Sequence, residues 1–331
     1  MAMDASPPIP RLTPELTDRY RIVGSLGDGA NGSVYRGVQQ RSGAAVAIKV
    51  LNAELDDPDR AKQRLDREGR VLQALQIPHV IRCLDQGVAP GSRPYLVLEY
   101  SSGERLSDHL AEAGALPTLI AVEIGRQIAE ALVGLHGAGI LHRDLSPENV
   151  LIEGDLQRDP YVRLIDFGLV GLDGPGRAKL GLPDLTAPGT RMGTPWYTAP
   201  EQHQSPASDL YALGIMMFEM ITGAVPFEDT DSVALRMAHT WTRAPRLSER
   251  APGIVPRALD ALIADLLAKD PRSRPASADE IVTRLAHIIE IGGEGTPAPV
   301  ITDAEEVGEL PRGWWARIKR LWTRSPQTAH R

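Results

Sequence analysis

Residue types suited to phosphate chemistry recur in four short segments of this 331-residue chain, in a fixed order. The first segment, LGDGANGSV, holds Gly27, Gly29 and Gly32, and Lys49 follows inside the apolar run AAVAIKVL. A polar loop, HRDLSPEN, comes next, and Asp166 opens the fourth segment, DFG. Because glycine has no Cβ, its backbone N–H groups can approach phosphate oxygens closely. The glycine segment is therefore expected to bind a polyphosphate.

The residues around the glycines indicate which kind of phosphate site this is. A GxGxxG pattern alone also fits a dinucleotide-binding turn or an ordinary Gly-rich hairpin. A dinucleotide site needs a strand, a glycine turn and then a helix. Here Val34, Tyr35 and Val38 alternate in SVYRGV, which is typical of a second strand. The sequence therefore favours a hairpin that covers phosphates.

A lysine in an apolar run needs a partner, because burying an unpaired charge is costly. Asp57-Pro58 is a good helix start. Beyond it, Leu65, Glu68 and Leu72 recur at spacings of three and four. This spacing puts Glu68 on the inward stripe, the alternative being a surface charge at the edge of that stripe. Three neighbouring charges are expected at the surface: Asp66, Arg67 and Arg70.

The loop HRDLSPEN lies between two short apolar strands, expected at 140–141 and 150–152. Such a polar loop is a poor structural turn but a good functional site. Asp166 follows the apolar segment YVRLI and by itself fits a turn residue at a strand end. With Asp144 and Asn149 upstream, a functional role is favoured.

Together with the segment Ala199-Pro200-Glu201, these motifs resemble those of the protein kinases. The particular residues in the motifs resemble those of a bacterial, eukaryotic-like (Hanks-type) Ser/Thr kinase. The resemblance covers roughly residues 20 to 290. It implies an α+β, bilobal protein kinase-like fold, with a small β-rich lobe over 19–100 and a larger, mostly helical lobe over 101–290. It also implies transfer of the γ-phosphoryl group of ATP to Ser or Thr hydroxyls of proteins, with Mg²⁺, or Mn²⁺ as the alternative.

The resemblance assigns roles to five residues. Asp144 accepts the proton of the acceptor hydroxyl and orients it. Asn149 and Asp166 hold Mg²⁺, for which hard oxygen ligands are suited. Lys49 pairs with Glu68 and contacts the α- and β-phosphates.

Ser146 departs from the family pattern, because most such kinases carry lysine two residues after the catalytic aspartate. Serine donates a hydrogen bond but supplies no charge to the transferring phosphate. We retain Ser146 among the catalytic candidates and interpret it as a variant. The alternative is a pseudokinase, a nucleotide-binding scaffold that acts through protein–protein interactions. A third interpretation is a kinase-like enzyme that acts on small molecules. The intact APE segment disfavours it, because in the family this segment helps to form a platform that binds polypeptides.

The resemblance also implies a nucleotide pocket and a scaffold. Adenine would lie against Leu26, Val34 and Ala47, with Leu98 as gatekeeper. It would also form hydrogen bonds with the backbone of Glu99 and Ser101 in the hinge, the segment YLVLEYSSG. The remaining nucleotide-binding candidates are Gly27, Gly29, Gly32 and Lys49. The pocket residues also fit plain core and linker positions. Two scaffold contacts are expected, Glu201 with Arg274, and Asp209 with the backbone of the HRD loop.

An activation segment is expected between Asp166 and Glu201. Its best candidates for phosphorylation are Thr186 and Thr190, with Thr186 favoured, and Arg143 would bind the phosphate. Thr194 is expected to lie against the catalytic loop and to select Ser/Thr over Tyr acceptors. The alternative is that these threonines are ordinary loop residues, whose hydroxyls form hydrogen bonds with water or with the nearby backbone.

Composition agrees with this interpretation. The net charge of −7 predicts no general nucleic-acid binding. The single cysteine, Cys83, excludes an internal disulfide and indicates a reducing compartment. The N-terminus lacks the apolar core of a signal peptide, and the apolar stretch 210–227, which contains Glu219, is expected to be a buried helix. We expect a cytoplasmic protein, with peripheral membrane association as an alternative.

Both ends of the chain differ from its centre. Residues 1–18 read as a Pro-rich, poorly ordered arm and 291–311 as a linker. Residues 312–331 form a basic tail, in which 312–324 are expected to fold as a short amphipathic helix. Its apolar and basic positions are Trp314, Trp315, Ile318, Leu321, Trp322, Arg317, Lys319, Arg320 and Arg324. It could dock on a membrane surface or an acidic partner, or fold back onto the helical lobe, the slightly favoured option.

Overall fold

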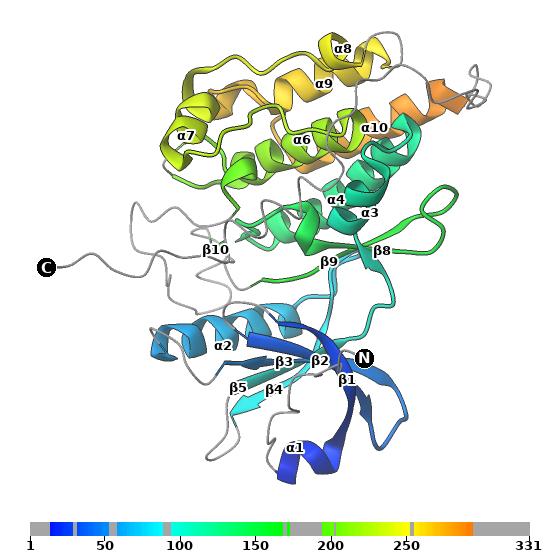
Figure 1. Cartoon of the computed structure of the whole chain (residues 1–331), viewed down its shortest axis with the longest axis vertical. Helices are drawn as coiled ribbons and strands as arrows, with labels where there is room; N and C mark the ends of the chain where they lie inside the picture. Colours follow the sequence, from blue (N-terminus) through cyan, green and yellow to red (C-terminus); the bar gives the residue numbers. More distant parts are fainter. Residues whose placement is uncertain are drawn as a thin grey trace, which may run out of the picture.

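The computed structural model describes two lobes, over residues 14–28, 32–52, 58–88, 94–167, 171–172, 194–201, 203–251 and 255–293. Figure 1 shows a sheet with helix α2 as the lower, smaller lobe and the remaining long helices as the larger lobe above it. The α+β architecture with two lobes is as predicted.

The smaller lobe is built on a five-stranded antiparallel sheet in the order β1-β2-β3-β5-β4. Its strands are β1 (Tyr20–Asp28), β2 (Gly32–Gln39), β3 (Ala45–Leu51), β4 (Cys83–Val88) and β5 (Pro94–Glu99). On β3, Val46, Ile48 and Val50 are buried in an apolar cluster on one face. Because successive strand residues point to opposite faces, Ala47 and Lys49 lie on the other face of the sheet.

The chain enters this sheet through helix α1 (Pro14–Arg19). Leu16 is buried against Tyr20 and the β3 cluster. The prediction of a poorly ordered arm through residue 18 is therefore wrong for 14–18, because one apolar side chain anchors this turn of helix. Residues 1–13 lie outside the described residues.

Helix α2 (Pro58–Ala74) packs on β4 and β5 and begins at Pro58, as its sequence predicted. The inward stripe is also as predicted, since Leu65, Glu68 and Leu72 are buried. The surface position expected for Arg67 is wrong, because this side chain is buried too. The buried arc of α2 is wider than its apolar stripe, which sequence periodicity alone does not reveal.

The larger lobe contains α3 (Leu106–Ala113), α4 (Thr118–Gly137), α6 (Pro206–Thr222), α7 (Ser232–Trp241), α8 (Leu247–Arg250), α9 (Arg257–Leu266) and α10 (Ala278–Gly293). Helix α4 packs between α6 and α10. Short elements shape the connections: β6 (Glu104–Arg105), β7 (Ile140–Leu141), β8 (Val150–Glu153), β9 (Tyr161–Leu164), β10 (Gly171–Leu172), η1 (Pro147–Asn149), η2 (Pro195–Tyr197) and η3 (Pro271–Ser273). Helix α10 ends at Gly293, three residues past the predicted domain boundary at 290.

Helix α6 is the buried centre of this lobe. Every residue from Ser208 to Ile221 is buried, as expected for the apolar stretch. A capping box of Ser205 and Ser208 begins the helix, and Gly223, with a φ of 77°, ends it in the left-handed conformation. Within the described residues, no helix is long and apolar enough to cross a membrane.

Backbone hydrogen bonds join the two lobes between the segment that follows α2 and strand β9. The Leu164 N–H donates to His79 O (2.7 Å), and the Ile81 N–H donates to Leu164 O (3.0 Å). The segment that follows α2 is thereby fixed to β9, the strand that leads into Asp166. Side chains on α2 and after β9 are thus held in one frame.

Candidate active site

Lys49 lies between two carboxylates contributed by different elements. Its Nζ is 2.9 Å from Glu68 Oε2 on α2 and 3.0 Å from Asp166 Oδ1, just after β9. The predicted pair of Lys49 with Glu68 is therefore present. The contact brings together β3, α2 and the end of β9, so it joins residues of both lobes.

These contacts set the charge of the lysine. Burial alone would lower the pKa of Lys49, but the carboxylates of Glu68 and Asp166 outweigh it and raise that pKa. Burial raises the pKa of Glu68, with Lys49 acting in the opposite direction. Glu68 also accepts a hydrogen bond from the Phe167 N–H (3.3 Å). Lys49 is therefore a fixed cation at neutral pH, the charge needed to contact a phosphate.

Asp144 is held from two sides in the loop between β7 and β8. The Thr194 N–H and Oγ1 both donate to Asp144 Oδ1, at 3.0 and 3.2 Å. Asn149 Nδ2 donates to Asp144 O (2.8 Å) and to Asp144 Oδ2 (3.2 Å). Since the amide nitrogen of Asn149 is engaged, its carbonyl oxygen is the atom of that side chain suited to ligate a cation.

Two residues of the site adopt a backbone conformation that is rare outside glycine. Arg143 has a φ of 67° and Asp166 a φ of 61°. Such positions cost about 1–3 kcal/mol each and cluster at functional sites. The rest of the fold must hold both residues in place, and Asp209 does so for Arg143.

Asp209, near the start of α6, fixes the loop from below. Its carboxylate accepts the backbone N–H groups of His142 and Arg143, each at 3.0 Å, as predicted. His136 Nε2 on α4 lies 2.9 Å from the same carboxylate. Burial would raise the pKa of Asp209, but these hydrogen bonds and nearby histidines lower it. A buried anion thus anchors the backbone immediately before Asp144.

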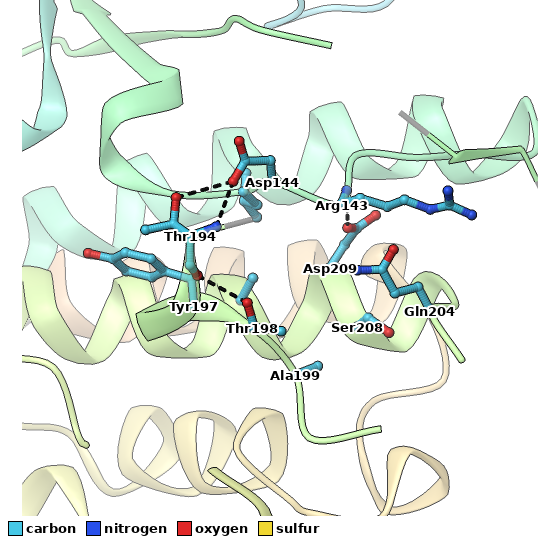
Figure 2. Close-up of a pocket in the computed structure, with 11 residues that line it drawn as sticks. Arg143, Asp144, Thr194, Tyr197, Thr198, Ala199, Gln204, Ser208 and Asp209 are labelled. Atoms are coloured by element: carbon cyan, nitrogen blue, oxygen red, sulfur yellow. Dashed lines mark hydrogen bonds between the residues drawn. The ribbon is translucent and has the colours of Figure 1, made fainter. Parts of the chain in front are cut away.

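Figure 2 shows how this loop meets the segment around η2. Thr194 points toward Asp144, and Asp209 lies next to Arg143. A cavity of about 20 Å³ lies where the loop, the η2 segment and α6 meet. It has room for a single water molecule and not for a nucleotide. The η2 segment is therefore packed directly on the catalytic candidates.

A family model for the protein kinase domain matches residues 20–285. The chain belongs to the protein kinase family. It is 33% identical over 277 residues to the serine/threonine-protein kinase pkn3 of Myxococcus xanthus, covering 81% of this chain and 49% of pkn3.

Two further relatives carry the same kind of name. The serine/threonine-protein kinase pkn2 of Myxococcus xanthus is 36% identical, with 86% of this chain and 35% of pkn2 covered. The serine/threonine-protein kinase PknL of Mycobacterium bovis is 32% identical, with 83% and 67% covered. The chain thus resembles bacterial Ser/Thr kinases, and it spans half or less of the length of the two Myxococcus relatives.

Gly27 lies near the end of β1, and Gly32 begins β2. Gly27 pairs with Val34, and Gly29 lies outside the described residues. A Cβ on Gly32 would lie 2.5 Å from Val50 O, so this glycine is required for the close approach of β2 to β3. A Cβ on Gly27 would meet nothing within 4 Å. The sequence argument explained Gly32 by phosphate approach and missed this packing reason.

The adenine candidates lie on neighbouring strands. Leu26 on β1 is 45% exposed, and Val34 pairs with Lys49 across β2 and β3. Ala47 pairs with Leu98, the expected gatekeeper, across β3 and β5. Leu98 itself is buried. The apolar side chains of Leu26, Val34 and Ala47 are all at least partly exposed, which suits contact with a flat apolar ligand.

At the hinge, the backbone groups are partly engaged. The Glu99 N–H donates to Arg82 O (2.9 Å), so the carbonyl is the Glu99 group suited to a ligand. Ser101 Oγ accepts the Gly103 N–H (3.1 Å), which shapes the turn toward β6. Both roles in nucleotide binding stay predictions.

Ser146 is fully buried, and its Oγ has no hydrogen-bond partner among the described residues. Its backbone oxygen accepts the Asn149 N–H (3.0 Å). In this conformation the hydroxyl is not presented to solvent where a phosphate could reach it. The catalytic role given to Ser146 stays a prediction, while its backbone shapes the turn at η1.

The segment after η2 is tied to the end of the lobe by Glu201 and Arg274, as predicted. Two hydrogen bonds join them, from Arg274 Nη1 to Glu201 Oε1 (2.8 Å) and from Arg274 Nη2 to Glu201 Oε2 (2.9 Å). Ser208 Oγ also donates to Glu201 Oε1 (2.7 Å). Burial would raise the pKa of Glu201, but Arg274 and Ser208 lower it. The bidentate pair is the strong form of this interaction.

Sequence reasoning missed one buried contact of the η2 segment. Tyr197 OH donates to Glu219 Oε2 on α6 (2.6 Å), and both residues are buried. Burial raises the pKa of Glu219 to about 7, although the bond from Tyr197 acts in the opposite direction. A lone glutamate inside an apolar helix was the available signal, because such a residue needs a polar partner.

Some predicted residues lie outside the described residues: Gly168, Thr186, Thr190 and the tail 312–324. Arg143 lies close to Gly171 on β10, since a Cβ on that glycine would meet the Arg143 guanidinium. Its predicted role in binding a phosphorylated threonine stays a prediction.

Proposed function

We propose that this chain is an ATP- and Mg²⁺-dependent protein kinase that phosphorylates Ser and Thr hydroxyls of proteins. The observation that carries the proposal is the joint geometry of Lys49, Glu68 and Asp166 on one side and Asp144, Asn149 and Thr194 on the other. Family membership and the names of the bacterial relatives support it.

The donor set fits a small, hard dication. Asn149 Oδ1 and the Asp166 carboxylate are oxygen ligands, the kind that Mg²⁺ prefers. Among the described residues, no group of three or more His, Cys, Asp or Glu side chains could hold a metal ion by itself. Mg²⁺ takes one or two protein ligands and completes its shell with phosphate oxygens and water. When bound, it neutralises charge on the phosphates.

The chain's own residues then have separate tasks. Lys49, held by Glu68, orients the α- and β-phosphates. Asp144 accepts the proton of the acceptor hydroxyl, and its two bonds from Thr194 keep the carboxylate aimed at that hydroxyl. Asn149 keeps Asp144 in place from the other side. Catalysis is mostly positioning and electrostatics, as expected for phosphoryl transfer.

The Ser/Thr preference rests on Thr194. Its hydroxyl and N–H both donate to Asp144 Oδ1, which supports an acceptor position next to the η2 segment. A short aliphatic hydroxyl reaches Asp144 there more readily than the ring of a tyrosine. We include autophosphorylation at Thr186 or Thr190 in the proposal, with Arg143 as the phosphate-binding residue.

The proposed compartment is the cytoplasm. Cys83 is buried, and burial raises its pKa to about 11. A buried, protonated thiol is inert. The sequence has no second cysteine to form an internal disulfide, which is typical of chains kept in a reducing environment.

The test is transfer of labelled phosphate from Mg·ATP to a generic basic acceptor protein such as histone. The wild-type chain should transfer label, and Asp144→Asn and Lys49→Met should each lower the rate by at least about a hundredfold. Nucleotide binding without transfer by the wild-type chain would favour the scaffold alternative. Equal transfer by Asp144→Asn would contradict the assigned mechanism.

A further inference from the structure

Helix α7 carries an apolar stripe on its outer face. Val233, Met237 and Trp241 are spaced four residues apart, so they share one face of the helix. Their exposed fractions are 57%, 57% and 79%. Leu235 and His239 on the opposite face are buried in the lobe. A contiguous exposed stripe that includes a tryptophan indicates a binding surface, unlike single scattered apolar residues.

The two ends of the stripe differ in charge. Glu228, Asp229 and Asp231 are exposed at the N-terminal end of α7, where Asp231 also caps the helix through the Val233 N–H (2.6 Å). Arg236 and Arg243 are exposed along the flank and beyond the C-terminal end. A fitting partner is an apolar helix with a basic part that faces the acidic end.

The chain contains one segment of this composition. Residues 312–324, RGWWARIKRLWTR, have apolar positions at helical spacing and basic residues on the other side. The linker that precedes them is acidic, with Asp303, Glu305, Glu306 and Glu309. If the apolar positions lie on the stripe with the segment antiparallel to α7, Arg324 at its C-terminal end lies near Glu228 and Asp229. The acidic linker that precedes the segment then falls toward Arg243, so the charges at both ends of α7 are matched.

We propose that residues 312–324 dock on the α7 stripe of the same chain. Residues 294–311 extend to about 60 Å at most, which exceeds the roughly 40 Å diameter of a lobe of this size. Such a tether also supplies an effective concentration on the order of millimolar. The attached segment therefore has an advantage over any untethered partner of similar chemistry.

The site of docking has a consequence for substrate access. Helix α7 contacts η2, the segment that follows Thr194. A docked tail lies beside the acceptor position and competes with protein substrates for that part of the surface. The docking itself goes beyond the proposed function and does not depend on phosphoryl transfer.

Cross-linking between introduced cysteines tests the docking in the full chain. The double variant Met237→Cys/Leu321→Cys is treated with a short bismaleimide at low protein concentration. Cys83 needs no replacement, because it is buried and its pKa is raised to about 11. The matched control is Leu119→Cys/Leu321→Cys, since Leu119 is a 44% exposed leucine on α4, away from the stripe.

The expected result is a product of monomer mass linking positions 237 and 321, formed about tenfold faster than in the control pair. Adding Glu228→Lys and Asp229→Lys should slow its formation severalfold. Equal rates for the two pairs would overturn the proposal. A product of dimer mass would assign the stripe to a second copy instead.

A membrane occupant is the remaining outcome. Sedimentation of the full chain with anionic vesicles, combined with absence of the 237–321 product, would assign the tail to a lipid surface and overturn docking on α7. Hydrogen exchange gives a second readout that needs no cysteine. Trp314→Ser/Trp322→Ser should increase exchange at α7 if the tail covers it, and unchanged exchange would also contradict the proposal.

Discussion

Glu68 is the residue that fixes the charge and position of Lys49. Glu68→Gln keeps the volume of the side chain but removes its charge, so Lys49 is left to Asp166 alone. We expect kcat/KM for ATP to fall roughly a hundredfold, because a misplaced phosphate contact is costly. Steady-state phosphorylation at varied ATP measures this. Asp66→Asn is the matched control on the same helix, where Asp66 pairs with Arg70 at the surface, and it should act like wild type. Wild-type kinetics for Glu68→Gln would contradict the assignment.

The raised pKa of Glu219 makes stability depend on pH. Between its ordinary value of 4.5 and about 7, the folded chain holds a proton that the unfolded chain has lost. The contribution of Glu219 to the free energy of unfolding therefore falls as pH rises through this window, by about 3 kcal/mol. Urea unfolding at pH 5 and pH 8 should show Glu219→Gln gaining stability relative to wild type at the higher pH. If the free energies of unfolding of wild type and Glu219→Gln differed by the same amount at both pH values, Glu219 would not be a buried carboxyl that is protonated at pH 5.

At the scale of elements, Asp209 connects α6 to the loop that carries Asp144. Asp209→Ala would leave the N–H groups of His142 and Arg143 unpaired and buried, at a cost on the order of 3 kcal/mol. We expect lower stability by urea unfolding together with a loss of phosphoryl transfer, because the loop loses its anchor. Asp265→Asn is the control in the same lobe, since Asp265 pairs with Arg284 at the surface, and it should change stability by less than about 0.5 kcal/mol. Full activity of Asp209→Ala would show that the loop holds its shape without α6.

Arg274 ties the segment after η2 to η3 in the same way. Its side chain is fully buried in a bidentate pair with Glu201. Arg274→Lys keeps the charge but loses the guanidinium group that forms two parallel hydrogen bonds. We therefore expect the free energy of unfolding to fall by about 2 kcal/mol. Arg272→Lys, two residues away with an 89% exposed side chain paired to Asp270, should be nearly neutral. Equal effects in thermal unfolding would mean that the buried geometry adds nothing.

Much of the arrangement of elements follows from the sequence, for identifiable reasons. The start of α2 at Pro58 and the strands around HRDLSPEN were predicted because capping residues and apolar runs are local signals. The burial of Arg67 and the pair of Tyr197 with Glu219 were not, since they depend on how elements far apart in the sequence pack. Leu16 was missed because one anchoring side chain leaves no periodic pattern.

At the scale of the whole chain, the proposed activity is transfer of phosphate to Ser and Thr hydroxyls by a member of the protein kinase family. The most direct measurement is phosphosite mapping by mass spectrometry after incubation of the full chain with Mg·ATP, beside Asp144→Asn. The wild-type chain should carry phosphoserine or phosphothreonine, including Thr186 or Thr190, and the variant should carry none. Phosphotyrosine as the main product, or no phosphate on a chain that still binds ATP, would contradict it.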